Sequence, residues 1–166
     1  MNVPAFDPLG ALQTLVAQGV KFVVIGGIAG RLWGSPSVTN DLDICYARDP
    51  ENLEALAGAL SHLQARLRGA PEDVPFVLDA QSLGAGANFT FETDAGNLDC
   101  LALPAGTDGY EDLARSAELV ELDGFSVHVV ALDDLIRMKR SAGRPKDRIE
   151  LEVLGALRDE IEAEEH

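Results

Sequence analysis

KFVVIGGIAGRLWGSPSVTNDLDI, residues 21–44, is the stretch that decides the fold of this chain. Its pattern predicts a buried strand at 21–25, a double-glycine turn, a short helix near 28–34 and a second strand that opens at Asp41. Successive side chains of a strand point to opposite faces. We therefore expect Asp41 and Asp43 to share one face, while Leu42 and Ile44 point into the core.

Asp41 and Asp43 bring two like charges together beside the glycine turn. Two unit charges at about 4 Å repel by roughly 4 kcal/mol at the effective dielectric of a protein, so the pair predicts a cation between them. Such hard oxygen ligands suit Mg²⁺, which one or two carboxylates and substrate phosphates typically hold. Gly26 and Gly27 let backbone amides approach a phosphate at the start of a helix. These residues predict a metal-dependent enzyme that acts on a nucleoside triphosphate.

The same residues carry a family resemblance. Ile25-Gly26-Gly27, followed after residues 28–40 by Asp41-Leu42-Asp43-Ile44, resembles the signature of the DNA polymerase β-type nucleotidyltransferase superfamily. The superfamily places a third carboxylate on a later strand, and Asn97-Leu98-Asp99-Cys100-Leu101 fits that position. Residues 132–147, LDDLIRMKRSAGRPKD, resemble the bacterial AbiEii and MenT branch of nucleotidyltransferase toxins.

The resemblance implies a role for each acidic and glycine residue. Asp41 and Asp43 would hold the metal that bridges the triphosphate, and Asp99 would complete a second metal position and help to deprotonate the attacking hydroxyl. Gly26 and Gly27 would line the phosphates. The implied cofactor is Mg²⁺ in a site with room for two ions, and Mn²⁺ could substitute.

The resemblance also implies a phosphate-binding role for the basic segment. Lys139 would contact the β- and γ-phosphates, and Arg144, Lys146 and Asp147 are weaker candidates for the same site. The solvated-helix alternative for Lys139 stays open, because cations at a helix end also complement its dipole. Ser37 and Asn40 stand where many relatives carry basic loop residues.

Charge is distributed unevenly along the chain. The formal net charge of −15 opposes general nucleic-acid binding, because phosphate contacts need Lys and Arg. Six of the 13 basic residues nevertheless fall within positions 137–148: Arg137, Lys139, Arg140, Arg144, Lys146 and Arg148. We expect this segment to lie on the same side of the molecule as the aspartates and to form the main binding surface for an anionic substrate.

Length and hydropathy predict one α/β (α+β) domain over residues 1–166, with a mixed, largely antiparallel sheet flanked by helices. Further helices are expected at 7–18, from Pro50 along a leucine stripe that ends at Leu67, at 110–116, at 133–142 and from Pro145 onward. Hairpins are expected at 88–103 and 119–130. The acidic residues 158–166 should fray. No membrane span or signal peptide is predicted, so cytoplasmic residence is the default.

Three functions compete at this point. The first is a toxin that adds nucleotides to an RNA, plausibly a tRNA 3′ end, and is restrained by a cognate antitoxin. The second is a small-molecule, antibiotic-type nucleotidyltransferase, a hypothesis lowered by the lack of an extra helical domain for the acceptor. The third is a catalytically idle nucleotidyltransferase-fold module that binds a partner. The sequence leaves the acceptor, the preferred base and the oligomeric state open.

Overall fold

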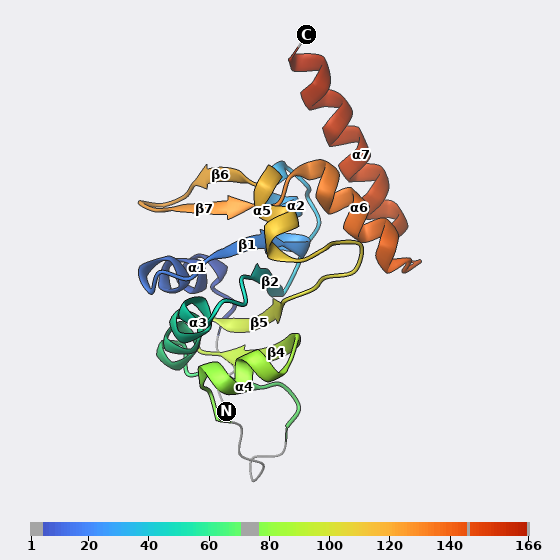
Figure 1. The fold of residues 1–166 in the computed structure, drawn as a ribbon. Helices are drawn as coiled ribbons and strands as arrows, with labels where there is room; N and C mark the ends of the chain where they lie inside the picture. The colour runs from blue at the N-terminus through green and yellow to red at the C-terminus, as the bar shows by residue number, and fades with distance from the viewer. Residues whose placement is uncertain (1–4, 71–76, 146, 166) are drawn as a thin grey trace.

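One mixed sheet organises the chain. The computed structural model describes residues 5–70, 77–145 and 147–165, and over these it has seven strands in the order β3-β4-β5-β2-β1-β7-β6 (Figure 1). Their bounds are β1 Phe22–Ile25, β2 Asp41–Tyr46, β3 Arg66–Leu67, β4 Asn88–Thr93, β5 Gly96–Leu101, β6 Glu118–Glu121 and β7 Ser126–Val129. The pairs β1–β7 and β2–β5 are parallel and the other four are antiparallel. The predicted mixed, largely antiparallel sheet is confirmed.

Three of the described helices begin at an aspartate that caps them. Their bounds are α1 Pro8–Ala17, α2 Gly26–Trp33, α3 Pro50–His62, α4 Ala80–Ala85, α5 Tyr110–Ser116, α6 Leu132–Ala142 and α7 Asp147–Glu164. Asp7 and Asp49 each accept a backbone N–H of the first turn, and a proline follows each of them at the first helical position. The C-terminal part of α7 projects beyond the rest of the molecule in Figure 1.

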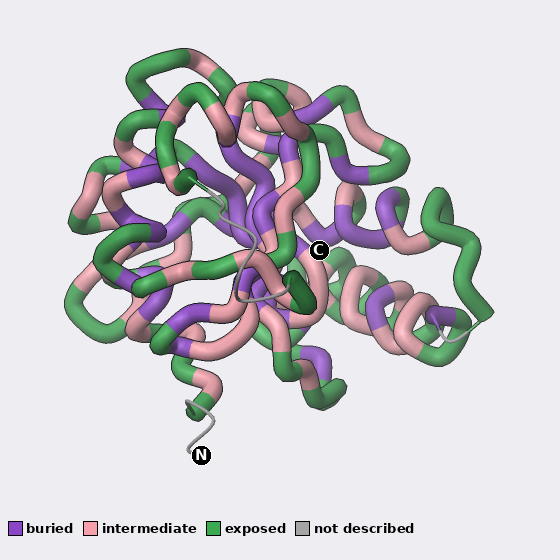
Figure 2. Tube along the Cα trace, turned by 90° about the horizontal axis from the view of Figure 1, so that it is seen from below, coloured by how far each residue is buried: buried purple, intermediate pink, exposed green. Residues whose placement is uncertain are grey.

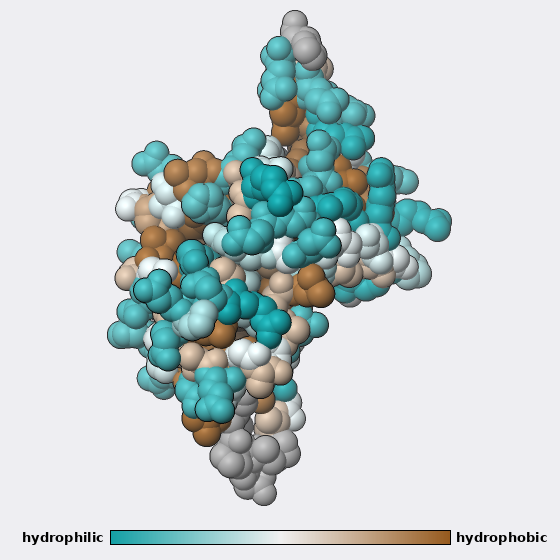
Figure 3. Space-filling view, viewed as in Figure 1, coloured by the Kyte–Doolittle hydropathy of each residue, from teal (hydrophilic) through white to brown (hydrophobic). Residues whose placement is uncertain are grey.

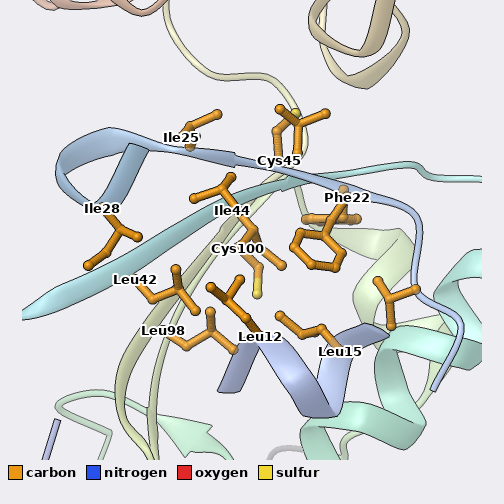
Figure 4. Close-up of a cluster of buried hydrophobic side chains, with 14 of the residues drawn as sticks. Leu12, Leu15, Phe22, Ile25, Ile28, Leu42, Ile44, Cys45, Leu98 and Cys100 are labelled. Carbon is orange, nitrogen blue, oxygen red and sulfur yellow. The ribbon is translucent and has the colours of Figure 1, made fainter. Parts of the chain in front are cut away.

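The hydrophobic core extends over both faces of the sheet, and one part of it lies between α1 and the strands. Figure 4 shows Leu12 and Leu15 of α1 on the same side of the strands as Leu42 and Leu98, whereas Cys45 lies on the other side. Leu42 and Ile44 are buried, as strand alternation predicts. In Figure 2 the buried backbone runs through the middle of the molecule and the exposed loops lie outside it. On the opposite face of β2, Asp41 and Asp43 are half-buried, whereas Cys45 is fully buried.

Two expectations about the elements need correction, and a third stays a prediction. Gly26 and Gly27 are the first residues of α2, so β1 passes directly into a helix without a separate turn. Helix α3 ends at His62, because Gln64 takes a positive φ of 52°, and Leu67 belongs to β3. Helix α7 continues to Glu164, so the fraying expected at 158–166 stays a prediction about its behaviour in solution. None of the described helices combines the length and the apolarity needed to cross a bilayer.

Candidate active site

The register of β2 and β5 brings the three aspartates together. These strands are parallel, with Asp43 opposite Asp99 and Asp41 opposite Asn97. Residues paired across neighbouring strands point to the same face, so Asp41, Asp43 and Asp99 share the face away from α1. Alternation along the strand is enough to predict that Asp41 and Asp43 share a face. Whether Asp99 joins them depends on the pairing of β2 with β5.

Asp43 is the electrostatic centre of the site. The residue is half-buried, but its Oδ1 atom is sealed from solvent and has no hydrogen-bond partner among the described residues. Burial raises the pKa of Asp43 to about 7, and the charges of Asp99 and Asp41 add to the rise, while Lys139 opposes it. A carboxylate without enough partners favours either a proton or a cation.

The other two aspartates have polar partners that the sequence did not reveal. Asn97 Nδ2 donates to Asp41 Oδ1 at 3.1 Å. Arg68 Nη2 donates to Asp99 Oδ1 at 2.8 Å. Asn97 could have been found, because it lies two residues before Asp99 and therefore shares its face. Arg68 had no such signal, since its reach to Asp99 depends on how β3 and β4 pair.

The two glycines allow the start of α2 to approach its neighbours closely. Gly26 has a φ of +68°, and a Cβ on it would clash with the Asp43 carboxylate. A Cβ on Gly27 would come within 2.8 Å of Thr39. Both glycines are thus required by close packing against β2 and the loop before it, which the sequence analysis did not predict. This packing places the N-terminus of α2 beside Asp43.

Helix α6 and the loop that follows it supply cations to the same pocket. Asp43 and Gly26 line a pocket of about 190 Å³ together with Lys139 and Arg144. The two basic residues are held by Asp147 at the start of α7, since Arg144 Nε donates to Asp147 Oδ2 at 2.9 Å and Lys139 Nζ lies 3.7 Å from its Oδ1. Asp147 is buried, so it fixes the direction of both side chains rather than contacting a phosphate itself.

The remaining basic residues divide into two groups. Arg140 and Arg148 line a second pocket of about 520 Å³, which adjoins the first through Lys139 and Arg144. Arg137 is instead paired with Asp112 and Asp134 at 3.1 and 3.2 Å, so its charge is already neutralised. Lys146 lies outside the described residues. The surface over α5 and α6 is hydrophilic in Figure 3.

The residues present have the chemistry to bind a hard divalent cation, although their side chains are not yet arranged as a complete set of ligands. Within residues 5–70, 77–145 and 147–165, no three His, Cys, Asp or Glu side chains are arranged so that they could already hold a metal ion. A cation would nevertheless stabilise the ionised form of Asp43, because its Oδ1 has no partner among the described residues and its pKa is raised by burial and by the neighbouring aspartates. Asp41, Asp43 and Asp99 supply the carboxylate oxygens that Mg²⁺ prefers. A cation would have to compete with Asn97 for Asp41 and with Arg68 for Asp99.

The arrangement of this sheet and its helices is the nucleotidyltransferase fold. TM1012 from Thermotoga maritima, which is assigned as a nucleotidyltransferase, matches 93% of the chain over 92% of its own length, with 18% identity and a TM-score of 0.54. The lincosamide antibiotic adenylyltransferase LnuA, bound to lincomycin, matches 90% of the chain over 94% of its own, with 13% identity and a TM-score of 0.58.

A third structure, ANT(2″)-Ia with adenylyl-2″-tobramycin, matches 94% of the chain over 95% of its own, with 17% identity and a TM-score of 0.51. The chain thus spans nearly all of both antibiotic-modifying structures, so the expected lack of an extra acceptor domain does not separate it from them. No protein-family model matches the sequence, and neither does the sequence of a curated protein.

Proposed function

We propose that this chain is a metal-dependent nucleotidyltransferase that moves a nucleoside monophosphate from a nucleoside triphosphate to an acceptor hydroxyl. The observation that carries the proposal is the composition of one pocket. Asp43, whose Oδ1 atom is sealed and has no partner among the described residues, lines this pocket beside Gly26. Lys139 and Arg144 are the basic residues of the same lining, which is otherwise largely apolar. Acidic and basic groups side by side match a cation and the polyphosphate that it accompanies.

The proposed chemistry assigns a part to each residue. Asp41 and Asp43 bind the cation, and Asp99 completes a second cation position. Lys139 binds the β- and γ-phosphates, with its position set by Asp147. The acceptor oxygen bonds to the α-phosphorus in line with the departing pyrophosphate, whose bridging bond breaks, while Asp99 accepts the hydroxyl proton. When bound, Mg²⁺, or Mn²⁺ in its place, would neutralise charge on the reacting and leaving phosphates.

An RNA acceptor is supported by the second pocket. Arg140, Arg144 and Arg148 gather there beside the proposed triphosphate site, in a chain whose formal net charge is −15. An anionic backbone would meet repulsion over most of such a surface and attraction here. Together with the resemblance of residues 132–147 to the AbiEii and MenT branch, this favours a tRNA 3′ end as acceptor and a cognate antitoxin as partner.

A small-molecule acceptor is the second candidate. The specific observation in its favour is the fold similarity to LnuA and ANT(2″)-Ia, whose structures hold lincomycin and an adenylylated tobramycin. Tobramycin is a cationic aminoglycoside, so the basic pocket between α6 and α7 would repel it. The charge of the acceptor therefore discriminates between the two candidates.

One experiment tests both proposals. The protein is incubated with Mg²⁺ and each α-labelled nucleoside triphosphate in turn, with total tRNA, lincomycin or tobramycin as acceptor. Labelled tRNA that is lost in Arg144→Ala and declines steeply with salt supports the RNA acceptor, whereas a labelled antibiotic supports the second candidate. Asp43→Asn should abolish transfer to either acceptor.

The same experiment can contradict the enzyme proposal. Transfer that persists in Asp43→Asn would remove the role given to Asp43. If no acceptor is labelled by the wild-type protein, the idle binding module becomes the better account. Circular dichroism of Asp43→Asn provides the folding control.

A further inference from the structure

The third aspartate of the site is already occupied by a cation from the chain itself. Arg68 Nη2 donates to Asp99 Oδ1 at 2.8 Å and also to the Phe91 backbone oxygen at 3.1 Å. Arg68 follows the edge strand β3, and its backbone N–H donates to Thr90 O of β4. The side chain therefore crosses β4 to reach Asp99 on β5.

The position of this guanidinium is set by the carboxylate. Arg68 Nε is sealed from solvent and has no hydrogen-bond partner among the described residues, so the side chain gives up hydration that an extended, solvent-facing arginine would keep. The bond to Phe91 O and the charge-assisted bond to Asp99 compensate for this loss, and the bond to Asp99 is the shorter of the two. The side chains of Arg68 and Asp99 are only 29% and 20% exposed. Arg66, two residues earlier, instead pairs with Glu92 at 3.5 Å and is 73% exposed.

We propose that Arg68 is a positioning residue that competes with the divalent cation for Asp99. In the nucleotide-free protein its guanidinium holds Oδ1 of Asp99, so that this oxygen is withheld from the incoming cation. The cation gains the third carboxylate by displacing Arg68. This inference rests on the proposed function, because it takes Asp99 as a cation ligand.

The competition explains why the three aspartates share a face without forming a finished metal cage. Asp43 and Asp99 are directly opposite in register, yet one oxygen of Asp99 is committed to Arg68 and one of Asp41 to Asn97. The Asn97 amide is neutral and easily exchanged, whereas Arg68 carries a full charge that repels a nearby cation as well as blocking its ligand. Arg68 is thus the stronger of the two obstacles.

The test measures cation affinity without catalysis. Mn²⁺ is titrated into nucleotide-free wild type, Arg68→Met and Arg66→Met, and free Mn²⁺ is followed by electron paramagnetic resonance. Arg68→Met keeps the apolar stem and removes the charge, and we expect it to bind Mn²⁺ about tenfold more tightly than wild type. Arg66→Met makes the same charge change beside an exposed partner, and we expect less than about a twofold effect.

Each outcome decides the inference. Equal or weaker Mn²⁺ binding by Arg68→Met, with the wild type still binding, would overturn it and leave the proposed function standing; weaker binding would mean that Arg68 instead holds Asp99 in place for the cation. Failure of all three proteins to bind Mn²⁺ up to about 10 mM, beyond the range of weak protein sites, would overturn the inference, because no cation then competes with Arg68 in the nucleotide-free protein. The same titration with a non-hydrolysable triphosphate present then tests the proposed function, which fails if Mn²⁺ binding is still absent. If Arg68→Met does not fold, Arg68→Gln replaces it, with the same tightening expected.

Discussion

Asp43 lies directly opposite Asp99 in the parallel pairing of β2 with β5. The two carboxylates therefore point to the same face at neighbouring positions of adjacent strands, where like charges repel. The structure relieves this repulsion only in part, through Arg68 on Asp99 and the distant charge of Lys139. A bound cation would relieve the remaining repulsion between Asp43 and Asp99. The first predictions below depend on this repulsion.

The metal-free protein should lose stability as pH rises from about 4 to about 8, through the titration of Asp43. The pKa of Asp43 is raised from 3.8 to about 7. The folded state therefore binds this proton more tightly than the unfolded state, and the stabilisation present at low pH is lost as pH rises through 7. Thermal melts in EDTA at pH 5 and pH 8 measure the effect.

Asp43→Asn is the matched control for that pH dependence. Other carboxyl groups, such as Asp49 and Asp112, have lowered pKa values and change stability in the opposite direction. The informative quantity is therefore the difference in Tm between wild type and Asp43→Asn, which should shift in favour of the variant at pH 8. Saturating Mg²⁺ at pH 8 should raise the wild-type Tm and leave that of the variant nearly unchanged. A Tm difference independent of pH would contradict the assignment.

Lys139→Met should weaken triphosphate binding roughly 10- to 100-fold, because a hydrogen bond to a charged group contributes about 1.5–3 kcal/mol. Lys139 lines the pocket that contains Asp43. Arg137→Met is the control on the same helix, since Arg137 is engaged by Asp112 and Asp134. Isothermal titration with a non-hydrolysable triphosphate gives both affinities. Equal losses in the two variants would indicate a general charge effect instead of a contact by Lys139.

Asp147→Asn should reduce both stability and triphosphate affinity. The buried carboxylate of Asp147 holds Arg144 and Lys139, and removing its charge leaves two cations poorly compensated. We expect a loss of about 1–3 kcal/mol in the free energy of unfolding, the range for a buried polar group that loses its partner. Urea denaturation measures it. Unchanged triphosphate affinity in the folded variant would show that Asp147 acts on the fold alone.

Gly26→Ala should destabilise the protein and disturb the cation site. A methyl group at position 26 would clash with the Asp43 carboxylate, and the φ of +68° is unfavourable for alanine. The backbone effect alone costs of order 1–3 kcal/mol. Gly155→Ala in α7 is the control, because a Cβ there meets no neighbour within 4 Å, and it should stabilise the helix by about 0.5–1 kcal/mol. Urea denaturation and Mn²⁺ titration of both variants measure these effects. Wild-type stability and wild-type Mn²⁺ affinity in Gly26→Ala would contradict the close packing at Gly26.

Local sequence patterns were sufficient for the fold class and for two of the three aspartates. The order of strand, glycines and Asp-hydrophobic-Asp depends on neighbours within about 25 residues, and strand alternation places Asp41 and Asp43 on one face without further information. Helix caps such as Asp7 and Asp49 act within a single turn. Boundaries were less certain, because the start of α2 and the end of α3 depend on how these helices pack.

The sequence by itself determined a mixed α/β sheet, an acidic pair at the start of β2 and a basic segment at 137–148. Only the tertiary structure decided which of those charges meet. Arg68 reaches Asp99 across β4, Asp147 turns Lys139 and Arg144 toward Asp43, and Arg137 is paired elsewhere. The physical reason is that alternation and capping act within one element, whereas strand register and helix packing bring separate elements together. Arg68 and Asp99 are 31 positions apart, and Arg137 and Asp112 are 25. Even the short separation between Lys139 and Asp147 spans the end of α6 and the start of α7, so the packing of the two helices sets that contact.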